Sequence, residues 1–250
     1  MSAEELERFY AAEYRQLYQG EAGPIQKDLK TQALRANHLV DFVRKNAIPR
    51  LERTLDIGAS AGLLMSAFQE AFHCEVVGVE LGQAYRENAQ KSGLQVYPGL
   101  ADLPASLQGR CDLVSLAHVL EHFADPLSTL AELRRKWLAP GGWLLVEVPN
   151  LYCHDSFEVA HMLAYSRHTL SQVVLQAGFT ISNICTHGFP RSKALPLYIT
   201  LLGRAPRDGE TSPVPAIRPE RLVRLKRQWG FLKRRMIERL QPANAWQDIR

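Results

Sequence analysis

The segment Leu55-Asp56-Ile57-Gly58-Ala59-Ser60-Ala61-Gly62 decides the fold of this chain. It joins an apolar run that predicts a β-strand, Thr54–Ile57, to an amphipathic run that predicts a helix, Leu63–Phe72. Small residues at such a junction let the backbone turn tightly and approach a ligand, and the first amides of the helix can receive polar ligand atoms. The segment therefore predicts a ligand-binding turn after the first strand of an α/β sheet.

A carboxylate closes the second predicted strand, because Glu80 follows the apolar run Glu75–Val79. An acidic group at this place can accept hydrogen bonds from both ribose hydroxyls of a nucleotide. A third carboxylate, Asp102, lies in the loop after a short predicted strand, Gln95–Tyr97. Asp102 could accept from an adenine amino group, or it could be a solvated loop residue.

Short apolar runs continue to alternate with amphipathic stretches, which predicts βαβ units and a mostly parallel sheet. The last two β-rich runs are close enough in sequence to pair as a hairpin, so we expect the sheet to end in an antiparallel edge. The remaining predicted elements are the strands Asp112–Ala117 and Trp143–Val148, the helices Pro126–Leu138 and Thr169–Ala177, and the paired strands Phe179–Thr186 and Leu195–Leu202.

From about Leu51 to Arg204 the chain resembles class I S-adenosylmethionine-dependent methyltransferases. Its acidic and glycine positions match the D-x-G-x-G-x-G loop of that family, and Leu138–Gly142 matches the L-x-P-G-G turn. Ser60 departs from the pattern, since it occupies the middle glycine position. The resemblance implies a Rossmann-like, mostly parallel seven-stranded sheet with S-adenosylmethionine as cofactor. It implies cofactor-binding residues at Asp56, Gly58, Ala59, Ser60, Gly62, Glu80, Leu81, Asp102, Leu103, Ala117 and His118.

A narrower resemblance concerns bacterial methyltransferases that act on sugars, glycans or quinone precursors. It is carried by His118–Pro126, Val148–Asn150 and His161–Phe179. The opening Phe9-Tyr10 and Tyr14-Arg15-Gln16-Leu17-Tyr18, with Gln32 and Arg35, is similar to a cap of methyltransferases near surface-polysaccharide pathways. This implies O-methylation of a sugar or glycan, with a quinone precursor or another small metabolite as the alternative acceptor. It also implies that Arg35 meets the cofactor carboxylate, although Arg35 could equally be a surface residue.

Four candidate catalytic residues follow predicted strands, namely Glu121, His122, His154 and His161. If the acceptor is a hydroxyl group, a nearby base assists proton removal, and histidine is suited to neutral pH. Helix capping or packing is the alternative role of these side chains. Asp155 is a further candidate, and Tyr152, Phe157 and Tyr165 could form an acceptor wall or pack the cap.

Two motifs point to other enzyme classes. Gly58–Gly62 also spells G-x-S-x-G, the nucleophile elbow of α/β-hydrolases, but such an elbow would follow the first strand, and Glu80 would have no role. His118–His122 spells H-x-x-E-H, an inverted zinc-protease motif. It directly follows the strand Asp112–Ala117, where open α/β sheets bind ligands, so we expect a cofactor contact and no metal.

The composition predicts four regions: a helical cap over residues 1–50, a methyltransferase domain over 51–204, a linker over 205–219 and a basic amphipathic helix over 220–250. The net charge is +4, but Glu220–Leu240 holds eight Lys and Arg against two Glu, so the rest of the chain is slightly acidic. The main body therefore gives no reason to expect a nucleic-acid partner.

The basic helix carries one apolar stripe, formed by Leu222, Leu225, Trp229, Leu232, Met236 and Leu240. It could bind an anionic membrane surface or a protein, form a homo-oligomer, or dock on its own domain, which we favour. The chain could also be a cofactor-binding interaction protein without catalysis. The acidic N-terminus does not look like an export signal, and the four scattered cysteines fit a reducing compartment, so we expect a cytoplasmic protein.

Overall fold

The computed structural model describes residues 23–46, 48, 50–154, 161–210 and 214–249. The aromatic residues of the predicted N-terminal cap, Phe9 to Tyr18, and the candidates Asp155 and Phe157 lie outside the described residues. The chain divides into two compact units, with the boundary between Ser115 and Leu116. Each unit is therefore described by itself.

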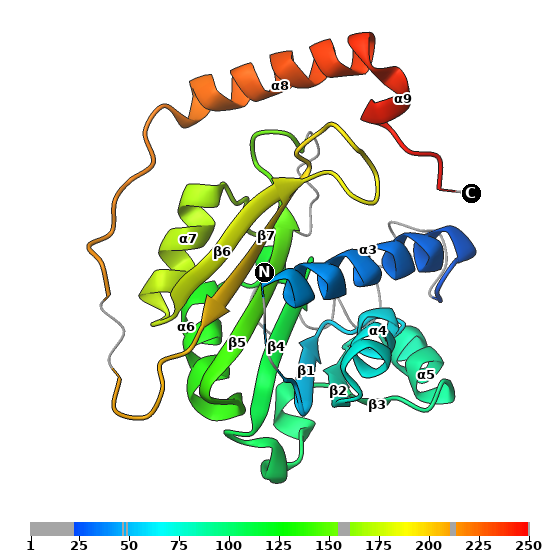
Figure 1. Ribbon diagram of the computed structural model, residues 1–250, viewed down its shortest axis with the longest axis vertical. Coiled ribbons are helices and arrows are strands. Elements are labelled where there is room, and N and C mark those ends of the chain that lie inside the picture. The colour runs from blue at the N-terminus through cyan, green and yellow to red at the C-terminus, as the bar shows by residue number, and fades with distance from the viewer. Residues whose placement is uncertain (1–22, 47, 49, 155–160, 211–213, 250) are drawn as a thin grey trace. The chain divides into compact units, whose positions relative to one another are not determined.

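The elements follow one another as helices alternating with strands (Figure 1). In chain order they are α3 Gln26–Lys45, β1 Arg53–Ile57, α4 Leu63–Phe72, β2 Glu75–Val79, α5 Gln83–Lys91, β3 Gln95–Tyr97, the 3₁₀ turns η2 Leu100–Asp102 and η3 Ala105–Leu107, β4 Cys111–Ala117, the 3₁₀ turn η4 Leu120–His122, α6 Pro126–Glu132, the π-turn η5 Leu133–Trp137, β5 Leu138–Pro149, α7 Arg167–Gln176, β6 Thr180–His187, β7 Tyr198–Arg204, α8 Val223–Leu240 and α9 Pro242–Ala245.

The strands form one seven-stranded sheet in the order β3-β2-β1-β4-β5-β7-β6. β1 pairs in parallel with β2, and β2 with β3, whereas β7 runs antiparallel to both β5 and β6. The prediction of a mostly parallel Rossmann-like sheet with an antiparallel edge pair is confirmed. The antiparallel strand itself is β7, which lies between β5 and the edge strand β6.

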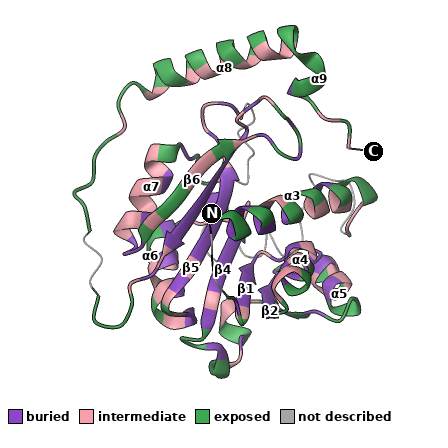
Figure 2. Ribbon diagram, viewed as in Figure 1, coloured by how far each residue is buried: buried purple, intermediate pink, exposed green. Residues whose placement is uncertain are grey.

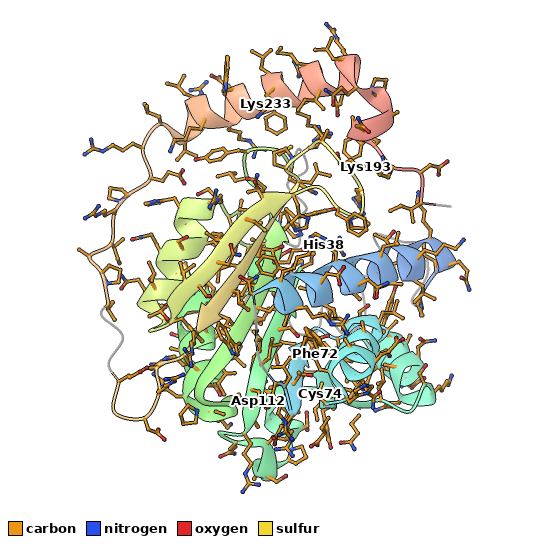
Figure 3. All side chains as sticks on the ribbon, in the orientation of Figure 1. His38, Phe72, Cys74, Asp112, Lys193 and Lys233 are labelled. Carbon is orange, nitrogen blue, oxygen red and sulfur yellow. The ribbon has the colours of Figure 1, made fainter. Side chains whose placement is uncertain are left out.

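The first unit places apolar side chains between its helices and strands. α3 packs on α4 through its buried face, where Leu39 and Val43 are fully enclosed, and Met65 and Phe68 of α4 are buried as well. Asp112, labelled in Figure 3, accepts hydrogen bonds from the amides of Glu52 and Arg53 at 2.7 and 3.0 Å. These bonds fix the start of β1, and with it the position of the loop that follows.

In the second unit the central strands are buried almost throughout (Figure 2), because helices and neighbouring strands cover their apolar side chains. α7 packs on β6. Phe179, which directly precedes β6, is fully enclosed. The helix begins at a capping box, in which Ser166 Oγ accepts from the amide of Thr169 and Thr169 Oγ1 accepts from the amide of Ser166. This cap explains why α7 starts two residues before the predicted helix.

Two predicted boundaries around the L-x-P-G-G segment were wrong. The predicted helix Pro126–Leu138 ends at Glu132 and continues as the π-turn η5, and β5 begins at Leu138, before the predicted Trp143. β5 is extended because its partner strand continues: Ala205 N donates to Gly142 O at 2.8 Å, and Gly141 N donates to Pro206 O at 2.9 Å. Pairing across the sheet, rather than local propensity, sets the start of this strand.

The last predicted strand, Leu195–Leu202, is displaced along the chain. β7 covers Tyr198–Arg204, and the residues before it form a tight turn in which Leu197 N donates to Leu195 O. Pro196 has no amide hydrogen to donate to a strand ladder, which accounts for the later start.

Candidate functional site

The loop after β1 has the backbone conformation that its glycines allow. Gly58, Ser60 and Gly62 all have positive φ, at 73°, 51° and 80°. Ser60 thus adopts a left-handed conformation that favours glycine, at a typical cost of about 1–2 kcal/mol for a residue with a Cβ. The amides of Gly58 and Ala59 donate to Val79 O at 2.8 and 2.9 Å, so the loop is tied to the end of β2.

Close packing below this loop depends on a glycine that sequence reasoning missed. A Cβ at Gly78 would lie 2.8 Å from Ala59 Cβ and 2.6 Å from Met65 Sδ. Only glycine therefore lets β2 approach the loop this closely. The signal was present in the sequence as a glycine inside a buried apolar strand, since such glycines often mark a close approach.

Glu80 is held in place by the same loop. Its Oε2 accepts from Ser60 N at 2.8 Å and its Oε1 accepts from Gly82 N at 2.7 Å, and the residue is only 9% exposed. A carboxylate offers about four acceptor positions, so two amide bonds leave room for two hydroxyl donors of a ligand. The carboxylate is therefore oriented in advance and able to bind a diol.

Asp56 lies in the core beneath the loop. It is 4% exposed, and Ser115 Oγ donates to its Oδ1 at 2.6 Å. Burial raises the pKa of Asp56 to about 7, the Ser115 hydroxyl opposes this, and the nearby charge of Glu80 adds to it. Ser115 was missed by sequence reasoning, although a lone hydroxyl in a buried apolar strand was a usable signal.

The other predicted cofactor residues of the first unit differ in exposure. Asp102, at the end of η2, and Leu81, which follows Glu80, are exposed and can contact a ligand. Leu103 is 6% exposed, so its side chain belongs to the core. Arg35 lies on α3 and is half-buried.

In the second unit, Ala117 ends β4 and His118 follows it with a positive φ of 59°. His118 Nε2 lies 3.1 Å from Glu147 Oε1, and the amide of His118 donates to Glu147 O at 2.8 Å. The His118 ring also packs edge-on against Tyr198, with centroids 5.0 Å apart. His118 is thus fixed by β5 and β7 as well as by its own strand.

Glu147 is a fully enclosed carboxylate that sequence reasoning missed. Its Oε2 accepts from Thr200 Oγ1 at 3.0 Å and lies 3.1 Å from His187 Nε2. Buried charges in proteins are normally paired in this way, because desolvation of a lone charge is costly. The available signal was a single acidic residue inside the apolar run of β5.

Three of the four candidate catalytic residues come together in the second unit. Glu121, His122 and His161 have ligand atoms that all lie within 4.8 Å of one another, and the two imidazole rings meet edge-on with centroids 4.9 Å apart. Glu121 is 1% exposed, and its carboxylate also lies 3.6 Å from His118 Nδ1. Burial raises the pKa of Tyr165, and the negative charge of Glu121 raises it further.

This trio consists of residue types that bind divalent cations, so it could hold one. Its third member is His161, which lies far from the H-x-x-E-H motif in sequence. No metal was expected from that motif. Within the part of the chain that the structure describes, the trio is the candidate metal-binding group.

The fourth candidate, His154, shares a pocket with His161. The pocket has a volume of about 140 Å³, and Leu151 and Arg227 contribute to its wall. The other lining residues are Pro149, Met162, Leu163 and Ala164. Of the aromatic residues that could form an acceptor wall or pack the cap, Tyr152 donates to Glu220 at 2.6 Å and Tyr165 is buried.

A large part of the chain is similar to known proteins. A model of a methyltransferase domain family matches residues 30–184, which is well over half of the chain. The ubiquinone biosynthesis O-methyltransferase of Chromobacterium violaceum is 29% identical over 118 residues, which cover 44% of this chain and 50% of that protein. The chain thus spans about half the length of the curated relatives that it matches.

Two solved structures share the fold. A chain from the complex between a Haloferax volcanii methyltransferase activator and a putative methyltransferase has a TM-score of 0.59 at 19% identity, covering 81% of this chain and 98% of that one. A Burkholderia thailandensis 1,6-didemethyltoxoflavin-N1-methyltransferase with bound S-adenosylhomocysteine has a TM-score of 0.56 at 19% identity, covering 81% and 86%. These two matches confirm the predicted fold, and the family match confirms the predicted methyltransferase class. None of the matches supports the hydrolase or zinc-protease alternatives. The chain belongs to the methyltransferase domain family.

Proposed function

We propose that this chain binds S-adenosylmethionine through the loop Gly58–Gly62 and Glu80 and transfers its methyl group to a hydroxyl acceptor. The observation that carries the proposal is the clamped carboxylate of Glu80, which two backbone amides orient while its remaining acceptor positions suit a ribose diol. The left-handed loop beside it consists of small residues, so a ligand can approach its backbone closely. Asp102 would accept from the adenine amino group, and Arg35 would meet the cofactor carboxylate.

When bound, S-adenosylmethionine supplies an activated methyl group on a sulfonium. The remaining tasks of the protein are to orient the acceptor, exclude water and take up the hydroxyl proton. Glu121, His122, His154 and His161 are the candidate groups for that proton, because three of them form one cluster and His154 shares a pocket with His161. Histidine suits this role near neutral pH.

Two acceptor classes remain within this proposal. The N-terminal sequence favours a sugar or glycan intermediate, whereas the curated relatives are described as ubiquinone biosynthesis O-methyltransferases, which favours a quinone precursor. Both acceptors offer a hydroxyl group. The mechanism proposed for the protein side chains is therefore the same for either class.

The binding part of the proposal is tested by calorimetry with S-adenosylmethionine. We expect Glu80→Ala to weaken binding by at least about tenfold, because each lost charge-assisted hydrogen bond to a ribose hydroxyl costs about 1.5–3 kcal/mol. Glu70→Ala is the matched control, since Glu70 is an exposed carboxylate on α4 of the same unit. Undiminished affinity in Glu80→Ala would contradict the proposal.

The transfer part is tested with radiolabelled S-adenosylmethionine and two acceptor preparations, a glycan fraction and a prenylated phenol. Labelled product in one of them identifies the acceptor class. The same assay with a chelator distinguishes catalysis by a base from dependence on a cation at Glu121, His122 and His161. Tight binding without transfer to any acceptor would support a cofactor-binding interaction protein instead.

A further inference from the structure

The helix α8 has two faces of different chemistry, and it lies outside the region that the family model matches. Figure 2 shows the helix exposed along one side and half-buried along the other. The half-buried side consists of Val223, Arg227, Gly230, Phe231, Arg234, Ile237 and Glu238. The exposed side, called here the outer face, carries the apolar residues Leu225, Trp229, Leu232, Met236 and Leu240.

The half-buried side docks on residues of the same unit. Arg227 donates to Leu151 O, and Arg234 donates to Cys153 O at 2.9 Å. A Cβ at Gly230 would overlap the carbonyl oxygen of Tyr152, so the helix approaches this loop as closely as glycine allows. Rotating the helix to bury its outer face would break these contacts.

The segment before the helix and its last turn are fixed as well. Glu220 accepts from Tyr152 Oη at 2.6 Å and from Lys226 Nζ at 3.0 Å, and also from Ser166 Oγ. Burial by itself would raise the pKa of Glu220, but these hydrogen bonds lower it, so the carboxylate is held as an anion. Ile237 packs against an apolar cluster that includes Tyr198 and Ala245. The helix therefore docks through hydrogen bonds and through Ile237 near its C-terminal end, while the apolar residues of its outer face remain exposed.

The outer face is strongly apolar and strongly basic. Trp229 is 69% exposed and Leu240 is 75% exposed. Several large apolar side chains exposed on one face are typical of a surface that binds a partner. Exposed basic residues flank the stripe, namely Arg221, Arg224, Lys226, Lys233, Arg235 and Arg239, of which Lys233 is labelled in Figure 3. Of the two acids in this stretch, Glu238 bonds to Arg234 on the docked side, whereas Glu220 bonds to Tyr152 and also pairs with Lys226. The outer face therefore carries a positive charge beside its apolar surface.

We propose that the outer face of α8 binds the surface of an anionic phospholipid bilayer, with the helix lying in the plane of the interface. An apolar stripe flanked by Lys and Arg has the composition of interfacial helices, whose apolar side enters the acyl boundary while the cations meet lipid phosphates. A second copy of the chain is a less suitable partner, because two such faces would bring like charges together. No helix among the described residues is long and apolar enough to cross a bilayer, so this contact is peripheral.

Membrane binding would also bear on the acceptor, a step that rests on the proposed function. α8 docks on the loop that contains Leu151. Leu151 and Arg227 both line the pocket of His154 and His161. A bilayer at the outer face would lie about one helix diameter, roughly 10–12 Å, from this pocket. The acceptor class that fits this arrangement is a hydroxyl compound anchored to a lipid, whether its head is a sugar or a phenol.

The test uses the full chain and two kinds of vesicle, phosphatidylcholine alone and phosphatidylcholine mixed with phosphatidylglycerol, in a flotation assay. We expect the protein to float with the anionic vesicles, less so at high salt, and hardly with the neutral ones. The variant Trp229→Ser/Leu232→Ser should bind the anionic vesicles at least about tenfold more weakly. The matched control is Val214→Ser/Ile217→Ser, which removes two exposed apolar side chains outside the helix and should bind like the wild type.

Three results would overturn the proposal: equal flotation with neutral and anionic vesicles, equal flotation of the wild type and the outer-face variant, or a wild-type dimer that the outer-face variant converts to a monomer in sedimentation. Calorimetry with S-adenosylmethionine on the same variants separates this proposal from the proposed function. The outer-face variant should bind the cofactor like the wild type. Lost vesicle binding with intact cofactor binding therefore assigns the effect to α8.

Discussion

At the scale of single residues, Asp56, which lies beneath the loop Gly58–Gly62, makes the stability of the protein depend on pH. Its pKa is raised to about 7 in the folded chain from an ordinary value of 3.8, chiefly by burial. The folded state therefore holds the proton more tightly than the unfolded chain. The free energy of unfolding should fall as the pH rises between about 4 and about 7, because over this range the unfolded carboxyl is ionised and the folded one is still protonated.

Replacing Asp56 with Asn removes this titration and keeps an acceptor for Ser115. Between about pH 5 and about pH 7 we expect the wild type to lose about 2 kcal/mol of unfolding free energy relative to Asp56→Asn. Urea unfolding at the two pH values measures the difference. Asp41→Asn, an exposed site on α3, is the control and should follow the wild type. Parallel pH profiles for the wild type and Asp56→Asn would mean that Asp56 is ionised throughout.

Some residues of the candidate site could be predicted from the sequence, and others could not. Gly58, Gly62 and Glu80 were predictable, because a turn between strand and helix and a carboxylate at a strand end are local patterns. The pairing of Glu147 with His187 was not. Their pairing depends on β5, β6 and β7 lying side by side, and no local pattern encodes the distance between them.

At the scale of elements, the N-terminus of α7 depends on Ser166. Its hydroxyl accepts from the amide of Thr169, and it is 1% exposed. We expect Ser166→Ala to lower the free energy of unfolding by roughly 1–2 kcal/mol, since a lost cap leaves a helix amide without its acceptor. Ser171→Ala, on the exposed side of the same helix, should change it by less than about 0.5 kcal/mol. Equal effects of the two substitutions in chemical denaturation would contradict this role.

Elements differed in how well the sequence predicted them. The strands β1, β2 and β4 and the helix α4 were expected within about one residue, because continuous apolar runs and a clear periodicity mark them. The helix α5 was not predicted, since only Tyr85 and Ala89 of its nine residues are buried and its apolar pattern is weak. The π-turn η5 was not predicted either, because a single wide turn leaves no distinct sequence period.

At the scale of the whole molecule, β4 belongs to both compact units, as the boundary falls between Ser115 and Leu116 within that strand. A shared strand couples the stability of the units, so we expect a single thermal transition. S-adenosylhomocysteine at about 100 times its dissociation constant should stabilise the folded chain by about 2.7 kcal/mol. For a chain of this size that corresponds to a rise of roughly 5–10 °C in the midpoint.

Scanning calorimetry with and without the ligand checks this prediction. Glu80→Ala at the same ligand concentration is the control and should show about half the rise or less, because a tenfold weaker affinity leaves a stabilisation of about 1.4 kcal/mol. Two resolved transitions, of which only one moves with the ligand, would show that the units unfold separately.

The sequence by itself determined the α/β class, the order of most elements, the turn Gly58–Gly62 and the basic helix, because hydrophobic periodicity, glycine positions and charge runs act within a few residues of one another. Only the tertiary structure decided which distant groups meet. It brought His161 to Glu121 and His122, enclosed Glu147 between two histidines, and docked the side of α8 that carries Arg227 and Arg234. These outcomes depend on how separate elements pack, and packing is set by contacts between residues far apart in the chain.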